Sequence, residues 1–418
     1  MTPRSDAAAA AAIAGRGLSA TTAAIGEIHS AVAARVFART GRPSIPVKVV
    51  HDGITKGVYA AVENGAKVAS FAAGQVAGVV ATQRARTADY VRLTDRANAS
   101  LVVGALNGAW GDRFARWRNP LALEMTVRSG GHDVAPVRDE LAAAFPAGGG
   151  DLVVFLHGLC ETDRAWWRHA EQNFGDPASS HGSRLAALTG ATPIYLRYNS
   201  GLHISDNGAQ LATLLGALVA EWPVEVTSLT LIGHSMGGLV IRAACCLGLE
   251  ESQQWVPAVR RIVYLGSPHL GAPLEVAATA AGVALRRLPE TKPLATALAS
   301  RSVGIKDLRF GDIRPDDWAD VRDPDAWRQA PTECAPLLES AEHFYIGATL
   351  TREPDHFVAR IIGDALVTFP SASGDSPRRK LALEVDRGRH LGGLNHFDLL
   401  NHPRVWELLA AWLAAPAP

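Results

Sequence analysis

From about residue 121 onward, short apolar runs alternate with segments in which apolar residues recur every three or four positions. Leucines at this spacing between 205 and 222 predict a helix, with Ser205 as its N-terminal cap. Four continuous apolar runs are typical of parallel strands that are buried on both faces: 151–156, 193–198, 229–232 and 261–265. The pattern predicts an α/β protein with a mostly parallel central sheet flanked by helices.

Weaker signals extend this pattern toward both ends of the domain. Apolar and polar residues alternate from Leu121 to Arg128, which predicts a strand, and Gly130-Gly131 predicts the turn that follows. Two more strands and a last helix are expected further on, at 343–346, 381–385 and 404–414.

Two regions depart from the alternation. Residues 1–120 have a helical pattern and predict an N-terminal helical extension ahead of an α/β domain at 121–418. Within the extension, residues 57–81 form an amphipathic stretch, which could pack on the α/β domain or rest on a lipid surface. Helix-like pieces interrupted by prolines at about 273–336 predict a helical cap inserted at one edge of the sheet.

Composition and charge limit the classes of function. The 418 residues are 48% hydrophobic, and 41 Lys and Arg balance 41 Asp and Glu, so no electrostatic capture of nucleic acid is expected. The four cysteines lack the spacing of zinc ligands, and no metal site is predicted. No strong signal peptide or membrane-spanning run is evident, which favours a cytoplasmic protein; peripheral contact with a membrane and secretion are the alternatives. The oligomeric state is not indicated.

The most informative stretch is Gly233-His234-Ser235-Met236-Gly237, a G-x-S-x-G motif between an apolar strand and a helical run that starts at Leu239. This context places the serine at a tight strand-to-helix corner, where small neighbours are needed and the helix start favours negative charge. G-x-S-x-G also occurs by chance in a chain with 39 glycines. The strand before it and the helix after it favour Ser235 as a nucleophile.

A serine nucleophile needs a histidine base within hydrogen-bond reach. His396 is the preferred candidate because it lies in a loop between the last predicted strand and the last helix. His390 and His402 are the alternatives, and His402 directly precedes Pro403, as a residue at a helix entry does.

The histidine in turn needs a carboxylate that orients it, in the chain order serine, acid, histidine. Asp364 is the preferred acid because it follows the apolar pair Ile361-Ile362. Asp355 and Asp375 are the alternatives, and any one of these side chains could instead be a turn former.

Two backbone N–H groups are expected to stabilise the oxyanion of such a reaction. One belongs to Met236, the residue after the nucleophile, and the other to Leu159 in the loop after the strand at 151–156. Gly158 allows that loop a close approach, and Cys160 beside it is predicted to be a wall residue rather than a nucleophile.

Several residues are candidates for contact with a substrate, although core packing explains aromatic residues at least as well. His157 suits a structural hydrogen bond in its loop better than a catalytic role. The candidates are His157, Gly158, Trp166, Tyr198 and His234, with Trp167, Trp318 and Trp327 as further aromatic residues.

Taken in order, these motifs resemble the signatures of α/β-hydrolase lipases and esterases over roughly residues 121–418. The run Gly266-Ser267-Pro268-His269-Leu270-Gly271 resembles the G-[ST]-P-H-x-G run of bacterial triacylglycerol lipases and of the GPI inositol deacylase-like branch. Residues 153–159, 233–238, 363–367 and 394–397 resemble the oxyanion loop, the nucleophile motif, the acid motif and the histidine loop. Ala365 departs from the family pattern, which has glycine after the acid.

The resemblance implies an α/β-hydrolase fold with a Ser235–Asp364–His396 triad and oxyanion donors at Leu159 and Met236. It also implies a carboxylic ester hydrolase that cleaves acyl esters or lipids through an acyl-enzyme, without a metal or an organic cofactor. The same residues could instead transfer the acyl group to another alcohol, as in an acyltransferase. A lipid-binding or scaffold protein that has this fold but no activity is the third possibility.

Overall fold

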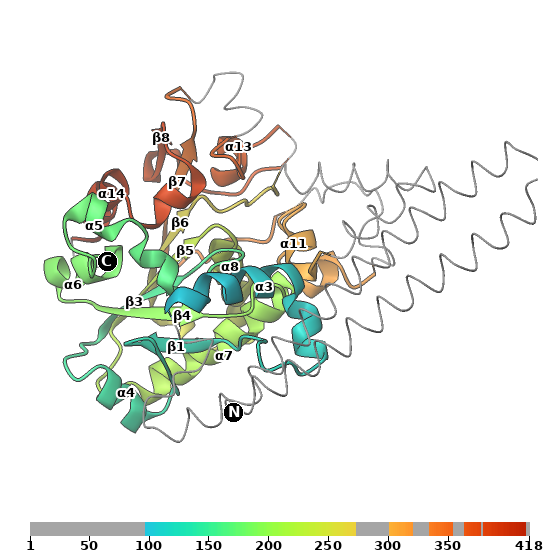
Figure 1. The fold of residues 1–418 in the computed structure, drawn as a ribbon. Coiled ribbons are helices and arrows are strands. Elements are labelled where there is room, and N and C mark those ends of the chain that lie inside the picture. The colour runs from blue at the N-terminus through green and yellow to red at the C-terminus, as the bar shows by residue number, and fades with distance from the viewer. Residues whose placement is uncertain (1–96, 273–300, 321–333, 354–362, 378, 415–418) are drawn as a thin grey trace, which may run out of the picture.

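The computed structural model describes residues 97–272, 301–320, 334–353, 363–377 and 379–414 (Figure 1). The predictions for residues 57–81, Asp355 and Trp327 lie outside these ranges. Of the predicted cap, the structure describes 301–320 and 334–336.

Within these residues, one eight-stranded sheet has the order β2-β1-β4-β3-β5-β6-β7-β8. The hairpin of β1 (Thr126–Ser129) and β2 (His132–Val134) lies at one edge, and β1 pairs antiparallel with β4 (Thr192–Arg197). All other neighbours are parallel, including β3 (Asp151–Leu156), β5 (Ser228–His234), β6 (Val259–Leu265), β7 (Glu342–Thr349) and β8 (Gly388–Gly392). The predicted mostly parallel sheet is therefore confirmed.

Helices cover both faces of the sheet (Figure 1). Helices α7 (Ile204–Glu221) and α8 (Met236–Glu250) pack on one face, while α6 (His181–Thr189) and α14 (Pro403–Leu413) pack on the other. The shorter helices are α4 (Arg138–Ala144), α5 (Ala170–Phe174), α11 (Val303–Asp307) and α13 (Phe369–Ala372), with 3-10 turns at Asp163–Trp167, Val256–Ala258, Pro315–Asp317, Val385–Arg387 and His396–Leu400.

The side chains of β3 show why its sequence is apolar without interruption. Leu152, Val154 and Leu156 belong to the core under α7 and α8. Val153 and Phe155 belong to the core under α6 and α14. Because successive side chains of a strand point to opposite faces, a strand covered on both sides needs apolar residues at every position.

Two strand predictions differ from the structure. Residues 121–125 are not a strand, because the side chain of Asn107 binds the carbonyl of Leu121 and the N–H of Leu123 at 2.8 and 2.9 Å. The strand expected at 381–385 is also wrong. The edge strand is the glycine-containing β8, where the first residue, Gly388, lies directly against the ring of Tyr345 and leaves no room for a side chain.

The predicted cap of α7 is wrong as well. His203, not Ser205, occupies the N-cap position and makes no side-chain cap bond. The backbone N–H of Ile204 donates instead to Asp307 Oδ2 at 2.9 Å, and His203 Nδ1 lies 3.0 Å from the same oxygen. The cap therefore comes from a residue about a hundred positions later, in the described part of the insertion.

Helix α3 (Ala97–Arg116) packs on the loops at the carboxyl ends of β3 and β4. A Cβ on Gly104 would lie 2.9 Å from the carbonyl oxygen of Cys160. A Cβ on Gly108 or Gly111 would lie closer still to the side chain of Cys160 or Asn199. Ser302 Oγ also donates to the carbonyl of Gly108. Glycine at these positions lets the helix backbone approach the loops directly.

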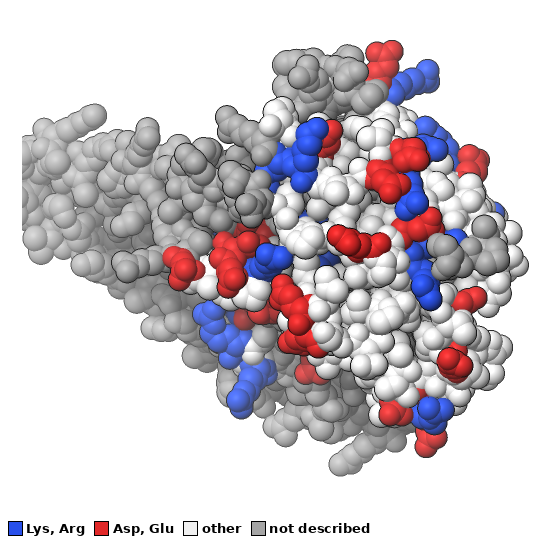
Figure 2. All heavy atoms as spheres, turned by 180° about the vertical axis from the view of Figure 1, so that it is seen from behind, with Lys and Arg blue, Asp and Glu red and all other residues white. Residues whose placement is uncertain are grey.

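The surface carries no broad field of one charge on the face that Figure 2 shows, where acidic and basic side chains of the described residues are interspersed. Among the described helices, none combines the length and the apolar character that crossing a membrane requires.

The contact between α7 and α8 can be tested with two glycines of α7. A Cβ on Gly208 would lie 2.5 Å from Ala243 Cβ, whereas one on Gly216 would lie 3.7 Å from its nearest neighbour. We expect Gly208→Ala to lower the free energy of unfolding by about 1–3 kcal/mol through overpacking. Gly216→Ala should raise it by about 0.5–1 kcal/mol, since alanine favours the helix. Chemical denaturation measures both changes in the free energy of unfolding. Equal effects of Gly208→Ala and Gly216→Ala would contradict the close contact between Gly208 and Ala243.

Candidate active site

Ser235 lies at the corner between β5 and α8, with φ +52° and ψ −122°. This left-handed backbone is unusual for a residue with a side chain and costs about 1–3 kcal/mol. Its N–H donates to the carbonyl of Leu265 at 2.8 Å, which extends the pairing of β5 with β6 past the end of β5. A Cβ on Gly237 would lie 2.5 Å from the carbonyl oxygen of Leu156, so the corner lies directly against β3. The glycines of the motif are thus required by close backbone contacts.

The structure brings the predicted acid and base together. His396 Nδ1 lies 2.7 Å from Asp364 Oδ2, and each side chain is only 1% exposed. The backbone N–H of His396 also donates to the carbonyl of Asp364 at 2.9 Å. The other carboxylate oxygen accepts from the N–H groups of Leu366 and Val367 at 3.0 and 2.8 Å. Asp364 is therefore held as an acceptor on both oxygens and fixes the imidazole ring.

The second ring nitrogen of His396 is buried and has no hydrogen-bond partner among the described residues. With Nδ1 donating to the carboxylate, Nε2 carries the free lone pair that a general base requires. The ring lies beside Gly266, where a Cβ would be 3.2 Å from His396 Cε1. Gly266 follows Leu265, the residue that binds the N–H of Ser235, so the histidine and the serine share one edge of the sheet.

The alternative candidates have other partners. His390 Nε2 lies 2.8 Å from Thr349 Oγ1. His402 caps α14, as its position before proline indicates, and its Nδ1 accepts from the N–H of Arg404 at 3.1 Å. Asp375 forms a surface ion pair with Lys380.

Met236, one predicted oxyanion donor, directly follows the serine, and the loop that carries the other, Leu159, lies beside it. A Cβ on Gly158 would be 3.0 Å from Ser235 Cβ, which places the loop after β3 against the nucleophile. Within the described structure, neither the N–H of Leu159 nor that of Met236 donates a hydrogen bond. Burial raises the pKa of the neighbouring Cys160 thiol to about 11, so this cysteine is protonated at neutral pH and is a poor nucleophile.

Four of the predicted substrate-contacting side chains are completely buried: His157, Trp166, Tyr198 and His234. The hydroxyl of Tyr198 donates to the carbonyl of His157 at 2.8 Å, and the two rings stack at 4.3 Å. The indole of Trp166 packs against Phe155. These contacts support the loop that carries Gly158 and Leu159. Direct contact of the four buried side chains with a substrate stays a prediction.

Sequence reasoning missed Glu161. Its Oε2 accepts from the N–H of Gly158 at 2.6 Å and lies 3.0 Å from His234 Nδ1, with all three residues buried. The one available signal was a carboxylate two residues after the predicted oxyanion donor. A buried charge of this kind needs a partner from elsewhere in the fold.

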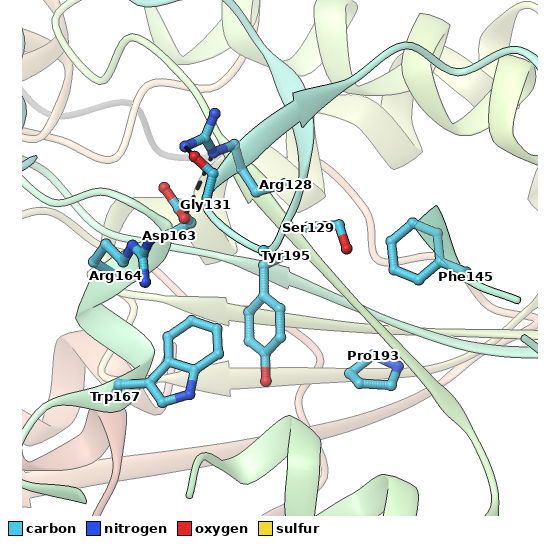
Figure 3. A pocket seen from close by; sticks show the side chains of 10 residues that line it. Arg128, Ser129, Gly131, Phe145, Asp163, Arg164, Trp167, Pro193 and Tyr195 are labelled. Carbon is cyan, nitrogen blue, oxygen red and sulfur yellow. Dashed lines mark hydrogen bonds and ion pairs between the residues drawn. The ribbon is translucent and has the colours of Figure 1, made fainter. Parts of the chain in front are cut away.

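Two cavities of the described region lie away from these residues. The first, of about 200 Å³, is lined by the rings of Phe145, Trp167 and Tyr195 and by a buried arginine, Arg128 (Figure 3). Arg128 pairs with Asp133. The second, of about 420 Å³, is lined by Arg242, Arg314 and Arg379 among others. Neither includes Ser235. The described residues contain no group of three or more His, Cys, Asp or Glu side chains that could hold a metal ion.

The strand order and the positions of the three polar residues decide the fold class. Ser235 follows β5, Asp364 comes after β7 in the chain, and His396 follows β8, which is the order serine, acid, histidine on a mostly parallel sheet. The family model described as a PGAP1-like alpha/beta domain matches residues 211–322.

The chain has an α/β-hydrolase fold.

Solved structures similar to this chain include lipase BlEst2 of Bacillus licheniformis in its propeptide form, at 18% identity and a TM-score of 0.42. That match covers 65% of this chain and 51% of the lipase, so it spans about half of the lipase's length. Lipase B of Aspergillus fumigatus is 13% identical with a TM-score of 0.38, over 69% of this chain and 60% of that one. A type II thioesterase of the yersiniabactin pathway, YbtT, is 16% identical with a TM-score of 0.37. The match covers 70% of this chain and 97% of the thioesterase. A comparison with curated proteins gives no match.

Ala365, where the family pattern has glycine, is expected to lower the free energy of unfolding. This exposed residue has φ +93°, a conformation that glycine adopts freely and residues with a side chain do not. We expect Ala365→Gly to raise the free energy of unfolding by about 1 kcal/mol and to keep the Asp364–His396 hydrogen bond. Ala178→Gly, at an exposed turn residue without positive φ, should instead lower it by about 0.4–1 kcal/mol. Chemical denaturation measures both changes. If Ala365→Gly and Ala178→Gly both lower the free energy of unfolding, the backbone at Ala365 is not strained.

Proposed function

We propose that this α/β-hydrolase is a serine carboxylic ester hydrolase that cleaves acyl esters or lipids through an acyl-enzyme. The observation that carries the proposal is the buried Asp364–His396 hydrogen bond of 2.7 Å, which leaves His396 Nε2 without a partner in the described region, at the edge of the sheet where Ser235 lies. A histidine held in this way is suited to remove a proton from a serine hydroxyl.

In the proposed first half-reaction, Ser235 Oγ attacks the ester carbonyl carbon while its proton passes to His396 Nε2. The N–H groups of Leu159 and Met236 bind the negative oxygen that forms. As the carbon–oxygen bond to the alcohol breaks, His396 gives its proton to the departing alcohol. Asp364 stabilises the imidazolium through Nδ1, and the acyl group remains on Ser235.

In the second half-reaction, water attacks the acyl-enzyme and loses its proton to His396. The acid product leaves, and the proton returns to Ser235 Oγ. Each step requires only side chains and backbone groups of this chain and one water molecule.

The proposal predicts that Ser235→Ala lowers kcat/KM by at least about 10³-fold, because the nucleophile is lost while the fold is kept. A chain-length series of p-nitrophenyl acyl esters measures this and also ranks short against long acyl chains. Ser228→Ala is the matched control, since Ser228 lies on the same strand at its opposite end. Equal rates for the native protein and Ser235→Ala would refute the assignment of the nucleophile.

Product analysis separates hydrolysis from transfer to an alcohol. With an added primary alcohol, a hydrolase releases mainly free acid, whereas an acyltransferase forms the new ester. A fluorophosphonate that labels the native protein and not Ser235→Ala would exclude the inactive lipid-binding or scaffold alternative.

A further inference from the structure

The pair of Glu161 and His234 lies directly behind the catalytic serine and is not explained by the proposed reaction. His234 precedes Ser235 at the end of β5, and Glu161 reaches it from the loop after β3. Their side chains are 0% and 8% exposed. A buried ion pair seldom adds net stability, because removing two charges from water costs about as much as their attraction returns. Its position at a functional site therefore calls for another role.

Hydrogen bonds show the protonation state of His234. Nδ1 lies 3.0 Å from Glu161 Oε2, and Nε2 lies 3.1 Å from the carbonyl oxygen of His396. A carbonyl oxygen and an ionised carboxylate only accept, so with Glu161 ionised both nitrogens donate and the ring is an imidazolium. Burial opposes this charge, but the carboxylate of Glu161 outweighs burial and raises the pKa of His234. Burial likewise opposes the charge of Glu161, and the attraction of His234 holds its pKa below the usual value.

His157, in the same loop, provides the contrast. Its Nδ1 lies 2.8 Å from the carbonyl oxygen of Gly158, while its Nε2 accepts from the N–H of Tyr198 at 3.3 Å. One donor and one acceptor describe a neutral ring, and burial lowers the pKa of His157. Two buried histidines beside one loop thus have different charges because of the groups that their nitrogens meet.

The charged pair connects three separate segments of the site. Glu161 accepts the N–H of Gly158, which fixes the peptide directly before the one that carries the N–H of Leu159. His234 donates to the carbonyl of His396, whose own N–H is bound by the carbonyl of Asp364. The oxyanion loop, the serine corner and the histidine loop are therefore joined through one ion pair.

We infer that Glu161 and His234 are positioning residues, which hold the oxyanion loop and the histidine loop in register with Ser235. The inference rests on the proposed function for its kinetic consequences. The titratable groups that interact with the pair from the surrounding segments are His157, Cys160, Tyr198 and Asp364, together with the backbone carbonyl of His396.

Glu161→Gln tests the role of the charge, because glutamine keeps an acceptor for the N–H of Gly158 and removes the counter-ion of His234. We expect kcat for the best p-nitrophenyl ester to fall about 10²-fold, as for a small misplacement of catalytic groups, with KM changed less than about 3-fold. Glu342→Gln is the matched control. Glu342 pairs with Arg261 and is the first residue of β7, so it lies at the amino ends of the parallel strands, whereas Ser235 follows the carboxyl end of β5. A native kcat in folded Glu161→Gln would overturn the inference.

Nuclear magnetic resonance gives a readout that requires no activity. In native protein at neutral pH, the ¹⁵N shifts of His234 should be those of a doubly protonated ring, and the amide signals of Gly158 and Leu159 should be single and sharp. In Glu161→Gln, His234 should lose one proton and these amides should broaden. A neutral His234 in the native protein would overturn the inference even if Glu161→Gln does not fold. Failure of the native protein to hydrolyse any ester would count against the proposed function and leave this result standing.

The same pair predicts a pH dependence of stability. The folded protein keeps a proton on His234 at pH values where the unfolded chain, with a histidine pKa of about 6.5, has lost it. The contribution of His234 is therefore fully present below about pH 6.5 and is lost as the pH rises through its raised folded pKa. Urea denaturation from pH 6 to 9 should show this decline in the native protein and a weaker one in Glu161→Gln. Identical pH dependence in both would contradict the charge assignment.

Discussion

The left-handed backbone at Ser235 is the constraint on which the rest of the site depends. A residue with a side chain adopts it only when its surroundings fix it more than once. Here the surroundings are β3 and β6 on either side of β5, and α8, which begins at the next residue. The hydrogen bond from Ser235 to Leu265 continues the β5–β6 ladder through the corner. The sheet thus holds the serine in a conformation that the local sequence does not favour.

Polar contacts then organise the loops around this corner. Asp364 receives two backbone N–H groups on one oxygen and His396 on the other. Glu161 receives the N–H of Gly158 and faces His234. Each buried carboxylate therefore serves both a loop and an imidazole, and the two systems meet at the backbone of His396. In a low-dielectric interior, buried hydrogen bonds of this kind are strong and restrict the loops that they join.

The sequence predicted the parts of the fold that depend on local pattern. The strands near 151, 193 and 261 and the final helix follow directly from apolar runs and helical spacing. The strand expected at 381–385 failed because an edge strand needs few apolar residues, and the backbone of Gly388 had to pass the ring of Tyr345. The Asp307 cap of α7 was not predictable, because the residues near Ile204 do not indicate a hydrogen-bond partner about a hundred positions later in the chain.

For the site, motif order identified Asp364 and His396 as neighbours, and the structure joins them. Motif order did not identify Glu161. Its role depends on a contact with His234 across two strands, and a glutamate in a loop has no periodicity that would mark it. Residues that act through other residues are, for this reason, harder to recognise in a sequence than those that react.

The glycine-rich face of α3 has a consequence for how the chain acquires its structure. This helix contacts the loops near Cys160 and Asn199, and it also accepts a hydrogen bond from Ser302, which is 194 positions beyond its partner Gly108. Contacts between residues so far apart form late, because the loop between them must first be closed. During synthesis from the N-terminus, α3 leaves the ribosome well before Ser302 is made. The hydrogen bond that joins Ser302 to α3 is thus completed only after most of the sheet has been translated.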